Sequence, residues 1–398
     1  MKRLSEAARL QQGAEGEALA SFLEMLRGLP DSRRQQGKRY PLDAVVLIAL
    51  MAMVCGRDDA EGLQDWGEIH QAWLGTFLSL PHGPPTQDVF LRVFAALDSK
   101  AFAAVFRAWA ALLRARLEVQ GKHIAVDGKT SRRARDADGS RLAPHVVSAW
   151  LSEEGLVLGQ YKTDNKSNEI TAIPELLRLL DVRGATITID AMGCQTEIAK
   201  TIVDAGGNYL LAVKDNQPTL HKDIVATFAA ARDPNSQLLG VAAQPATATH
   251  ETVDKDHGRL ERRVVTLCRD LQRISTAEQW SGLNFVVEVT RERTDLRTEK
   301  TSTEMAYYIG SDRDADARLA GERIRRHWSV ENELHWVLDM AFREDEARQR
   351  AGNAGENFAI LRHAALNIIK QDPHRRLGVP NTRRRAAEDR NYLISLLI

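Results

Sequence analysis

Two aspartates follow short apolar segments and could carry chemistry. Asp127 comes after residues 123–126 and precedes a glycine. Asp190 directly follows the Thr- and Ile-rich segment 185–189. An aspartate in such a place can simply begin a turn at a strand end. Carboxylate oxygens at strand ends are also the ligands that Mg²⁺ prefers. Both interpretations stay open for each residue alone, and a metal site would need a third acid.

The segment 327–339 offers that third acid. Four of its polar residues are spaced four apart and would form one row on a helix: His327, Glu331, His335 and Asp339. The apolar residues expected to pack this helix against the sheet are Val330, Leu334, Val337 and Leu338. A solvated helix face is one alternative. A zinc site made by the two histidines and Glu331 is another, but it leaves both aspartates without a role, so Glu331 is the favoured third acid.

Three carboxylates at one sheet edge suit a pair of Mg²⁺ ions. Two such ions about 3.5–4 Å apart can activate a water or a 3′ hydroxyl and stabilise the leaving oxygen of a phosphodiester. Without a cation the gathered carboxylates would repel one another and raise at least one pKa. Mn²⁺ accepts the same oxygen ligands and could substitute for Mg²⁺.

Composition limits the class of protein. The 398 residues carry 54 Lys and Arg against 54 Asp and Glu, so affinity for nucleic acid has to come from local patches. The longest apolar run, residues 44–56, is too short to cross a bilayer. No secretory leader is recognisable, and three widely spaced cysteines fit neither a disulfide framework nor a Cys-based zinc site. We expect a reduced, cytoplasmic protein that does not enter a membrane.

Basic patches give candidate DNA contacts. Residues 122–135 contain five basic residues against one acid, and residues 370–390 contain seven against three, although a solvated surface would look the same. The candidates near the strand ends are Lys129, Arg132, Arg133, Lys166, Asn168, Lys214, Asn216 and Gln217. Further candidates lie on an alternating strand face and on the polar helix row: His257, Arg259, Arg263, His327 and His335. For Trp328 and Trp336, core packing is favoured over stacking on unpaired bases.

The order of segments predicts an α/β fold with additions. Helical periodicity dominates residues 1–117, which we expect to form an N-terminal all-helical domain for DNA binding or assembly. Residues 118–239 read as three antiparallel strands followed by alternating strands and helices, which predicts a mixed sheet flanked by helices. A β-rich insertion at 240–312, helices at 313–370 that complete the core, and a basic tail at 371–398 follow.

The whole pattern resembles the DDE transposases of bacterial insertion sequences, specifically the ISAs-type group that includes the H-repeat-associated proteins. The stretches that carry the resemblance include "IAVDGKTSRRA", "KSNEITAIPELL", "ITIDAMGCQTEIA", "YLLAVKDNQPTL", "HGRLERR", "HWSVENELHWVLDMAFRED" and "NAGENFAILRHAALN". The resemblance implies a ribonuclease-H-like core whose catalytic triad falls on Asp127, Asp190 and Glu331 and holds two Mg²⁺ ions.

The same resemblance implies partners and an activity. DNA is the expected partner, as terminal inverted repeats and as target, bound by a homodimer or higher oligomer in the bacterial cytoplasm at the nucleoid. The expected reaction is cleavage at the element's ends followed by strand transfer. Two alternatives stay open: a catalytically inactive or domesticated DNA-binding derivative, and a metal-dependent nuclease without strand transfer.

Overall fold

The computed structural model describes residues 16–33, 38–116, 122–130, 145–163, 169–233, 245–256, 258–372 and 377–397. The chain forms two compact units. Unit 1 consists of Met1–Val119, Gly128–Asn168 and Glu331–Ile398, and unit 2 of Gln120–Asp127 and Glu169–Val330. Within the described ranges, no helix is both long and apolar enough to cross a membrane.

Nine strands form one mixed sheet in the order β3-β2-β1-β4-β5-β9-β8-β7-β6. β1 and β5 each pair in parallel with β4, whereas the β2–β3 pair and all pairings from β5 to β6 are antiparallel. The strands are β1 (His123–Thr130), β2 (His145–Leu151), β3 (Leu156–Thr163), β4 (Thr186–Ile189), β5 (Asn208–Val213), β6 (Thr247–Asp256), β7 (Arg259–Cys268), β8 (Phe285–Asp295) and β9 (Thr301–Gly310). The prediction of a mixed α/β fold is confirmed.

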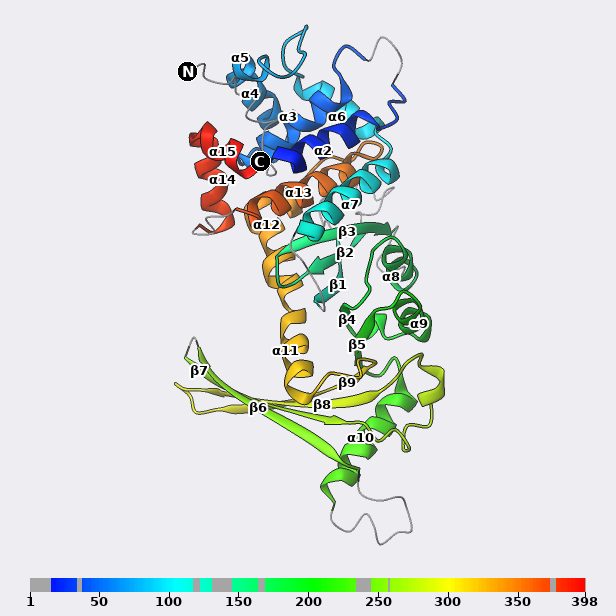
Figure 1. Cartoon of the computed structure of the whole chain (residues 1–398). Helices are drawn as coiled ribbons and strands as arrows, with labels where there is room; N and C mark the ends of the chain where they lie inside the picture. Colours follow the sequence, from blue (N-terminus) through cyan, green and yellow to red (C-terminus); the bar gives the residue numbers. More distant parts are fainter. Residues whose placement is uncertain are drawn as a thin grey trace. The chain divides into compact units, whose positions relative to one another are not determined.

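Unit 2 places helices against its strands. Its helices are α8 (Glu169–Arg178), α9 (Thr196–Asp204), α10 (Pro218–Arg232) and α11 (Ala317–His327), with short 3₁₀ turns η3 (Ala191–Gly193) and η5 (Ala277–Gln279). Helix α11 lies across β6, β7 and β8 and also contacts β4 and β5 (Figure 1). Its small and apolar residues Ala317, Ala320 and Ile324 are buried in one cluster with Val265 and Val287 of the strands.

The β-rich insertion continues the sheet of unit 2. Strand β9 pairs with β5 from Leu210↔Gly310 to Val213↔Tyr307, so β9, β8, β7 and β6 extend the sheet beyond the parallel strands. Gly310 is required at this junction because a Cβ there would lie 2.2 Å from the ring of Phe285. Strand β6 was not predicted.

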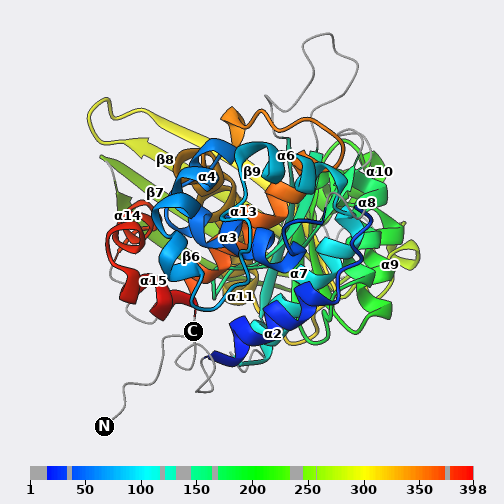
Figure 2. The same cartoon turned by 90° about the horizontal axis from the view of Figure 1, so that it is seen from above.

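Unit 1 is built mainly from helices. They are α2 (Gly16–Arg27), α3 (Leu42–Val54), α4 (Ala60–Ile69), α5 (Gln71–Leu74), α6 (Gln87–Ala96), α7 (Ser99–Arg116), α12 (Trp336–Phe342), η7 (Glu344–Glu346), α13 (Ala354–Lys370), α14 (Val379–Glu388) and α15 (Arg390–Leu397). The apolar segment Leu42–Val54 is buried along Ala44–Val54 because α2, α4, α6 and α13 pack around it (Figure 2). The buried helix expected from this run is confirmed.

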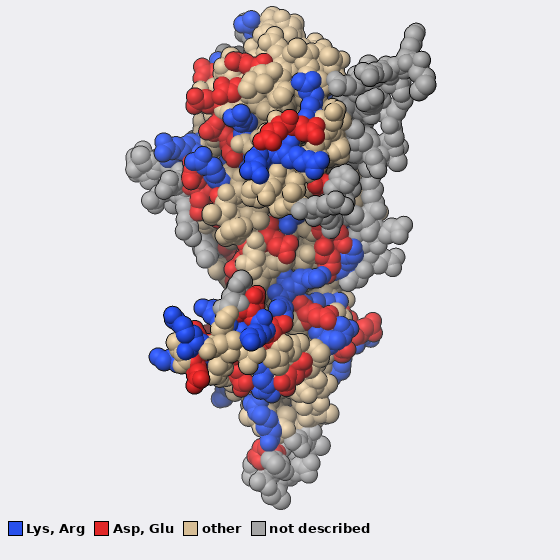
Figure 3. Space-filling view, turned by 90° about the vertical axis from the view of Figure 1, so that its left-hand side faces the viewer, with Lys and Arg blue, Asp and Glu red and all other residues tan. Residues whose placement is uncertain are grey.

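The basic C-terminal segment is folded and only partly solvated. Arg383 of α14 is 4% exposed, donates to the carbonyl oxygens of Met53 and Ala341, and pairs with Asp58. The interpretation of this segment as a solvated basic tail is therefore wrong for Arg383. Elsewhere Lys and Arg lie among Asp and Glu on the face drawn in Figure 3, as the balanced charge leads one to expect.

Candidate active site

Asp127 and Asp190 occupy equivalent positions on two neighbouring parallel strands. The β1–β4 register ends at Val126↔Ile189, so each aspartate is the residue that directly follows the last paired one. Adjacent strands lie about 4.8 Å apart, so the backbone positions of the two aspartates are neighbours at one edge of unit 2. One detail of the prediction is wrong, since β1 runs on to Thr130 and Asp127 is not its last residue. The pairing of β1 with β4, in contrast, ends at Val126, directly before Asp127.

The turn after β4 holds Asp190 in a defined conformation. Its Oδ1 accepts hydrogen bonds from the backbone N–H groups of Met192 (3.1 Å) and Gly193 (3.3 Å). Those bonds use one carboxylate oxygen, the side chain is exposed, and Oδ2 has no described partner. A Cβ at Gly193 would lie 2.2 Å from Cγ2 of Ile189, so the turn requires glycine. The turn orients Asp190 and leaves an oxygen for a cation.

Two amide side chains support the same turn. Asn216 Nδ2 donates to the carbonyl oxygen of Ala191 (2.6 Å), and Gln217 Nε2 donates to that of Cys194 (2.9 Å). One amide N–H of each residue connects the loop after β5 to the loop that follows Asp190, and the predicted contact of both residues with phosphate stays a prediction. Lys214, exposed in the same loop, has no described partner and remains a candidate phosphate contact.

A buried hydrogen-bonded row lies on the strands just before the aspartates. His123 Nε2 is 2.6 Å from Thr188 Oγ1, and the same hydroxyl is 2.8 Å from His327 Nδ1. Because a hydroxyl has one proton, Thr188 donates to one imidazole and accepts from the N–H of the other. The row fastens the last residue of α11 to the middle strand of the parallel set.

Both imidazoles of this row are neutral at pH 7. Burial lowers the pKa of His327 to about 4. Burial, together with the positive charges of Arg323 and Arg326 and of the His327 ring once it is protonated, lowers the pKa of His123 to about 3. A neutral imidazole bonded through Nδ1 to Thr188 offers no charge to a phosphate, and the role of His327 as a DNA contact stays a prediction.

The segment that carries Glu331 is not a regular α-helix. Helix α11 ends at His327, residues Val330–His335 form a π-helix (η6), and α12 begins at Trp336. A π-helical turn contains more residues than an α-helical turn, so the predicted four-residue row is interrupted here. The four apolar residues of the segment are all buried, and α12 packs mainly on η7 and α14.

Among the acids of this segment, Glu331 is the one left available. Glu333 pairs with Lys370 (3.4 Å) and Asp339 with Lys129 (2.5 Å), whereas Glu331 is exposed and has no described partner. Short π-helical segments are frequent at functional sites. Glu331 begins a stretch of unit 1, whereas both aspartates belong to unit 2, so its convergence with them stays a prediction. Within the described ranges, no group of three or more His, Cys, Asp or Glu side chains is placed to hold a metal.

The ammonium group of Lys129 lies among three carboxylates of unit 1. Its Nζ lies 2.5 Å from Asp339, 3.4 Å from Glu344 and 3.5 Å from Asp345. Burial by itself would lower the pKa of Lys129, but the carboxylates of Glu344 and Asp339 raise it above its usual value. An ammonium that already balances three carboxylates is poorly suited to bind phosphate, so the structure contradicts the prediction of Lys129 as a DNA contact.

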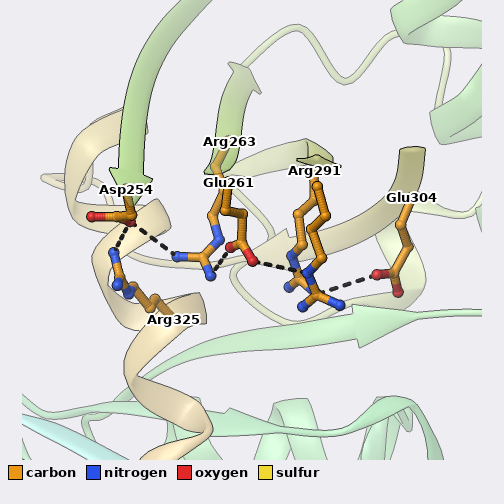
Figure 4. Close-up of polar contacts among 7 residues, drawn as sticks. Asp254, Glu261, Arg263, Arg291, Glu304 and Arg325 are labelled. Carbon is orange, nitrogen blue, oxygen red and sulfur yellow. Dashed lines mark hydrogen bonds and ion pairs between the residues drawn. The ribbon is translucent and has the colours of Figure 1, made fainter. Parts of the chain in front are cut away.

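The remaining predicted contacts differ in what the structure shows of them. Arg259 is exposed on β7, but Arg263 pairs with Glu261 and lies 3.9 Å from Asp254. Figure 4 shows Arg263 within a chain of ion pairs that reaches Arg325 of α11, which contradicts a role as a free phosphate contact. His335 is the last residue of the π-helical segment, and its contact with DNA stays a prediction. The predicted contacts that lie outside the described residues are Arg132, Arg133, Lys166, Asn168 and His257.

The two tryptophans around Glu331 are not core residues. Trp328 is 46% exposed and Trp336 is 59% exposed. The prediction of core packing is therefore wrong for both. The sequence also did not identify Thr188 as the hydrogen-bond partner of His123 and His327. The one signal for Thr188 is that polar and apolar residues alternate along β4, whose Ile residues are buried.

Comparison with known proteins shows the family of this chain. The family model described as "Transposase DDE domain" matches residues 119–368, and the model described as "DDE_Tnp_1-associated" matches residues 23–110. Two relatives from Escherichia coli (strain K12), "Putative protein YbfL" and "H repeat-associated putative transposase YhhI", are each 38% identical over 384 residues, covering 95% of this chain and 98% of theirs.

A solved structure of piggyBac transposase in a synaptic complex with hairpin DNA matches with a TM-score of 0.43 and 11% identity, covering 96% of this chain and 77% of that one. The family assignment comes from the sequence matches, which extend over nearly the whole chain. The chain belongs to the DDE transposase family.

Proposed function

We propose that this protein cleaves DNA at the terminal inverted repeats of its own insertion sequence and joins the freed 3′ ends to target DNA, using divalent metal ions. The observation that carries the proposal is the register of β1 and β4, which sets Asp127 beside Asp190 at one strand edge. Carboxylate oxygens from two adjacent parallel strands are hard donors of the kind that Mg²⁺ prefers.

The donor set fits a hard cation. Asp190 keeps Oδ2 after its backbone hydrogen bonds are made, and Asp127 adds carboxylate oxygens from the neighbouring strand. Glu331, exposed and without a described partner, is the proposed third ligand. Oxygen-only ligands favour Mg²⁺, with Mn²⁺ as a substitute. When bound, two such ions would activate the attacking water or 3′ hydroxyl and stabilise the leaving oxygen.

The protein's own groups would orient this site. Asn216 and Gln217 hold the turn after β4, and the Thr188 row fastens α11 to the strand that carries Asp190. The strand order β3-β2-β1-β4-β5, with β1, β4 and β5 mutually parallel, supports a ribonuclease-H-like core. DNA contacts would come from exposed basic residues such as Lys214 and Arg259.

The direct test uses DNA that ends in the element's own inverted repeats. We expect cleavage at the repeat end with Mg²⁺, none with EDTA, and joined products when a supercoiled target plasmid is added. Cleavage without joined products would favour the nuclease alternative. DNA binding without any cleavage, in Mg²⁺ and in Mn²⁺, would favour the inactive DNA-binding derivative.

A further inference from the structure

Unit 1 contains a polar cavity of about 500 Å³ that the proposed chemistry does not use. One wall is the turn between α3 and α4, residues 56–59, with the first turn of α4. The opposite wall is the connection between α12 and α13, residues 343–349, and Arg362 of α13 completes the lining. Four arginines and three acids line the cavity, so arginine is its most common charged residue.

The acids of the cavity already have partners. Asp58 pairs with Arg383, a buried residue outside the lining, and Glu346 pairs with Arg343. Asp59 is the N-cap of α4 and accepts from the backbone N–H of Gly62 (2.8 Å). The N-terminus of α4 is thus capped by the protein itself. Any anion in the cavity would have to be bound by the other arginines.

Two arginines of the lining, Arg57 and Arg348, have no such partner among the described residues, and a third, Arg362, is only partly compensated. Arg57 and Arg348 are exposed and make no described ion pair or hydrogen bond. Arg362 is 2% exposed, and its Nε is buried without a hydrogen-bond partner. The nearest carboxylate to its guanidinium is Glu344, at 3.7 Å, which also lies 3.4 Å from Lys129.

A buried guanidinium with unfilled donors is costly unless an acceptor reaches it. An anion bound in the cavity beside Arg362 would supply that acceptor. Phosphate fits best, because its oxygens can accept from several guanidinium groups at once and arginine binds phosphate through paired N–H donors. A cavity of about 500 Å³ is large enough for a phosphate together with part of the group that carries it.

We propose that this cavity, with Arg57 and Arg348 at its rim and Arg362 inside, binds a phosphate group of the DNA backbone. The assignment of DNA as the source rests on the proposed function, whereas the recognition of phosphate does not. The contact would lie in unit 1 and would fix the position of bound DNA without reading its sequence.

The test compares Arg57→Gln and Arg348→Gln with Arg92→Gln in the full-length protein. Arg92 is an exposed arginine of unit 1 on α6 that bonds only to a carbonyl oxygen of its own helix, so it is a matched control. Binding of inorganic phosphate is measured by calorimetry. Binding of a duplex carrying the terminal repeat is measured in EDTA over a series of salt concentrations, so that no cleavage occurs.

We expect each rim variant to bind phosphate about tenfold more weakly and to lower the slope of log affinity against log salt by about one unit. Arg92→Gln should match the wild type in both assays. Unchanged phosphate binding and unchanged slopes in both rim variants would overturn the proposal. Weaker phosphate binding with an unchanged DNA slope would overturn the DNA assignment and identify free phosphate as the ligand. Since all readouts are binding, a failure of cleavage leaves this test unaffected.

Discussion

Acidification should destabilise unit 2 through the two histidines that share the Thr188 hydroxyl. The folded pKa of His327 is about 4 and that of His123 about 3, both below the ordinary value of 6.5. The unfolded chain therefore binds more protons than the folded chain below pH 6.5, and stability falls as the pH falls. The stability that comes from keeping both imidazoles neutral is fully present above pH 6.5 and decreases as the pH falls from 6.5 toward 4.

The magnitude follows from these pKa values. From pH 6.5 to pH 5 each unfolded imidazole gains a proton over about 1.5 pH units, and each unit is worth about 1.36 kcal/mol. At pH 5 each histidine then lowers the free energy of unfolding by about 2 kcal/mol, and the pair lowers it by about 4 kcal/mol. The second protonation is opposed further because the two imidazoles share one hydroxyl.

Urea unfolding at pH 8 and pH 5 measures this effect. The variant His327→Gln removes one titrating group, so the difference in unfolding free energy between the two pH values should shrink by about 2 kcal/mol relative to wild type. A pH titration of the labelled histidine ring carbons, with His327→Gln identifying the signal, checks the pKa directly. If His327 titrates near pH 6.5 in the folded protein, or if the variant keeps the full pH difference, the reasoning is refuted.

Three further substitutions are tested by urea unfolding. Thr188→Val keeps the β-branched shape but removes the hydroxyl shared by two imidazoles, so the free energy of unfolding should fall by about 3 kcal/mol. Thr188→Ser keeps the hydroxyl and should lose much less, and equal losses in the two variants would contradict the hydrogen-bonded row. Lys129→Gln should destabilise unit 1 by about 3 kcal/mol because three carboxylates lose their cation, and an unchanged stability would restore Lys129 as a surface residue. Gly193→Ala should cost about 1–3 kcal/mol because its Cβ would collide with Ile189, and a neutral result would show that the turn can relax.

The central pair of the candidate site could be predicted from sequence because its signal is local. Each aspartate follows a short apolar segment, and the two segments pair in parallel up to the residue before each aspartate. The roles of Lys129 and Arg263 could not be predicted, because their partners lie far away in sequence. Asp339 is 210 residues from Lys129, and no local pattern reports such a contact.

Strand β6 shows the corresponding limit for the fold. Its residues are exposed or half-buried along the whole strand, so the alternation of buried and exposed residues that identifies a strand is weak. Its conformation is set by pairing with β7, which is a tertiary effect. The π-helical turn at Val330–His335 escaped prediction for a related reason, since an α-helix and a helix with one wide turn have nearly the same apolar spacing.

The most direct measurement compares Asp190→Asn with Asp314→Asn on the same terminal-repeat DNA. Asp314 is an exposed acid of unit 2 in the segment after β9, which runs antiparallel to β5, so it lies at the edge opposite the candidate site. Both variants should shift the DNA in a gel as wild type does. Cleavage in Mg²⁺ should fall below detection for Asp190→Asn and persist for Asp314→Asn. Retained cleavage by Asp190→Asn would show that Asp190 is only a turn residue and would contradict the proposed metal site.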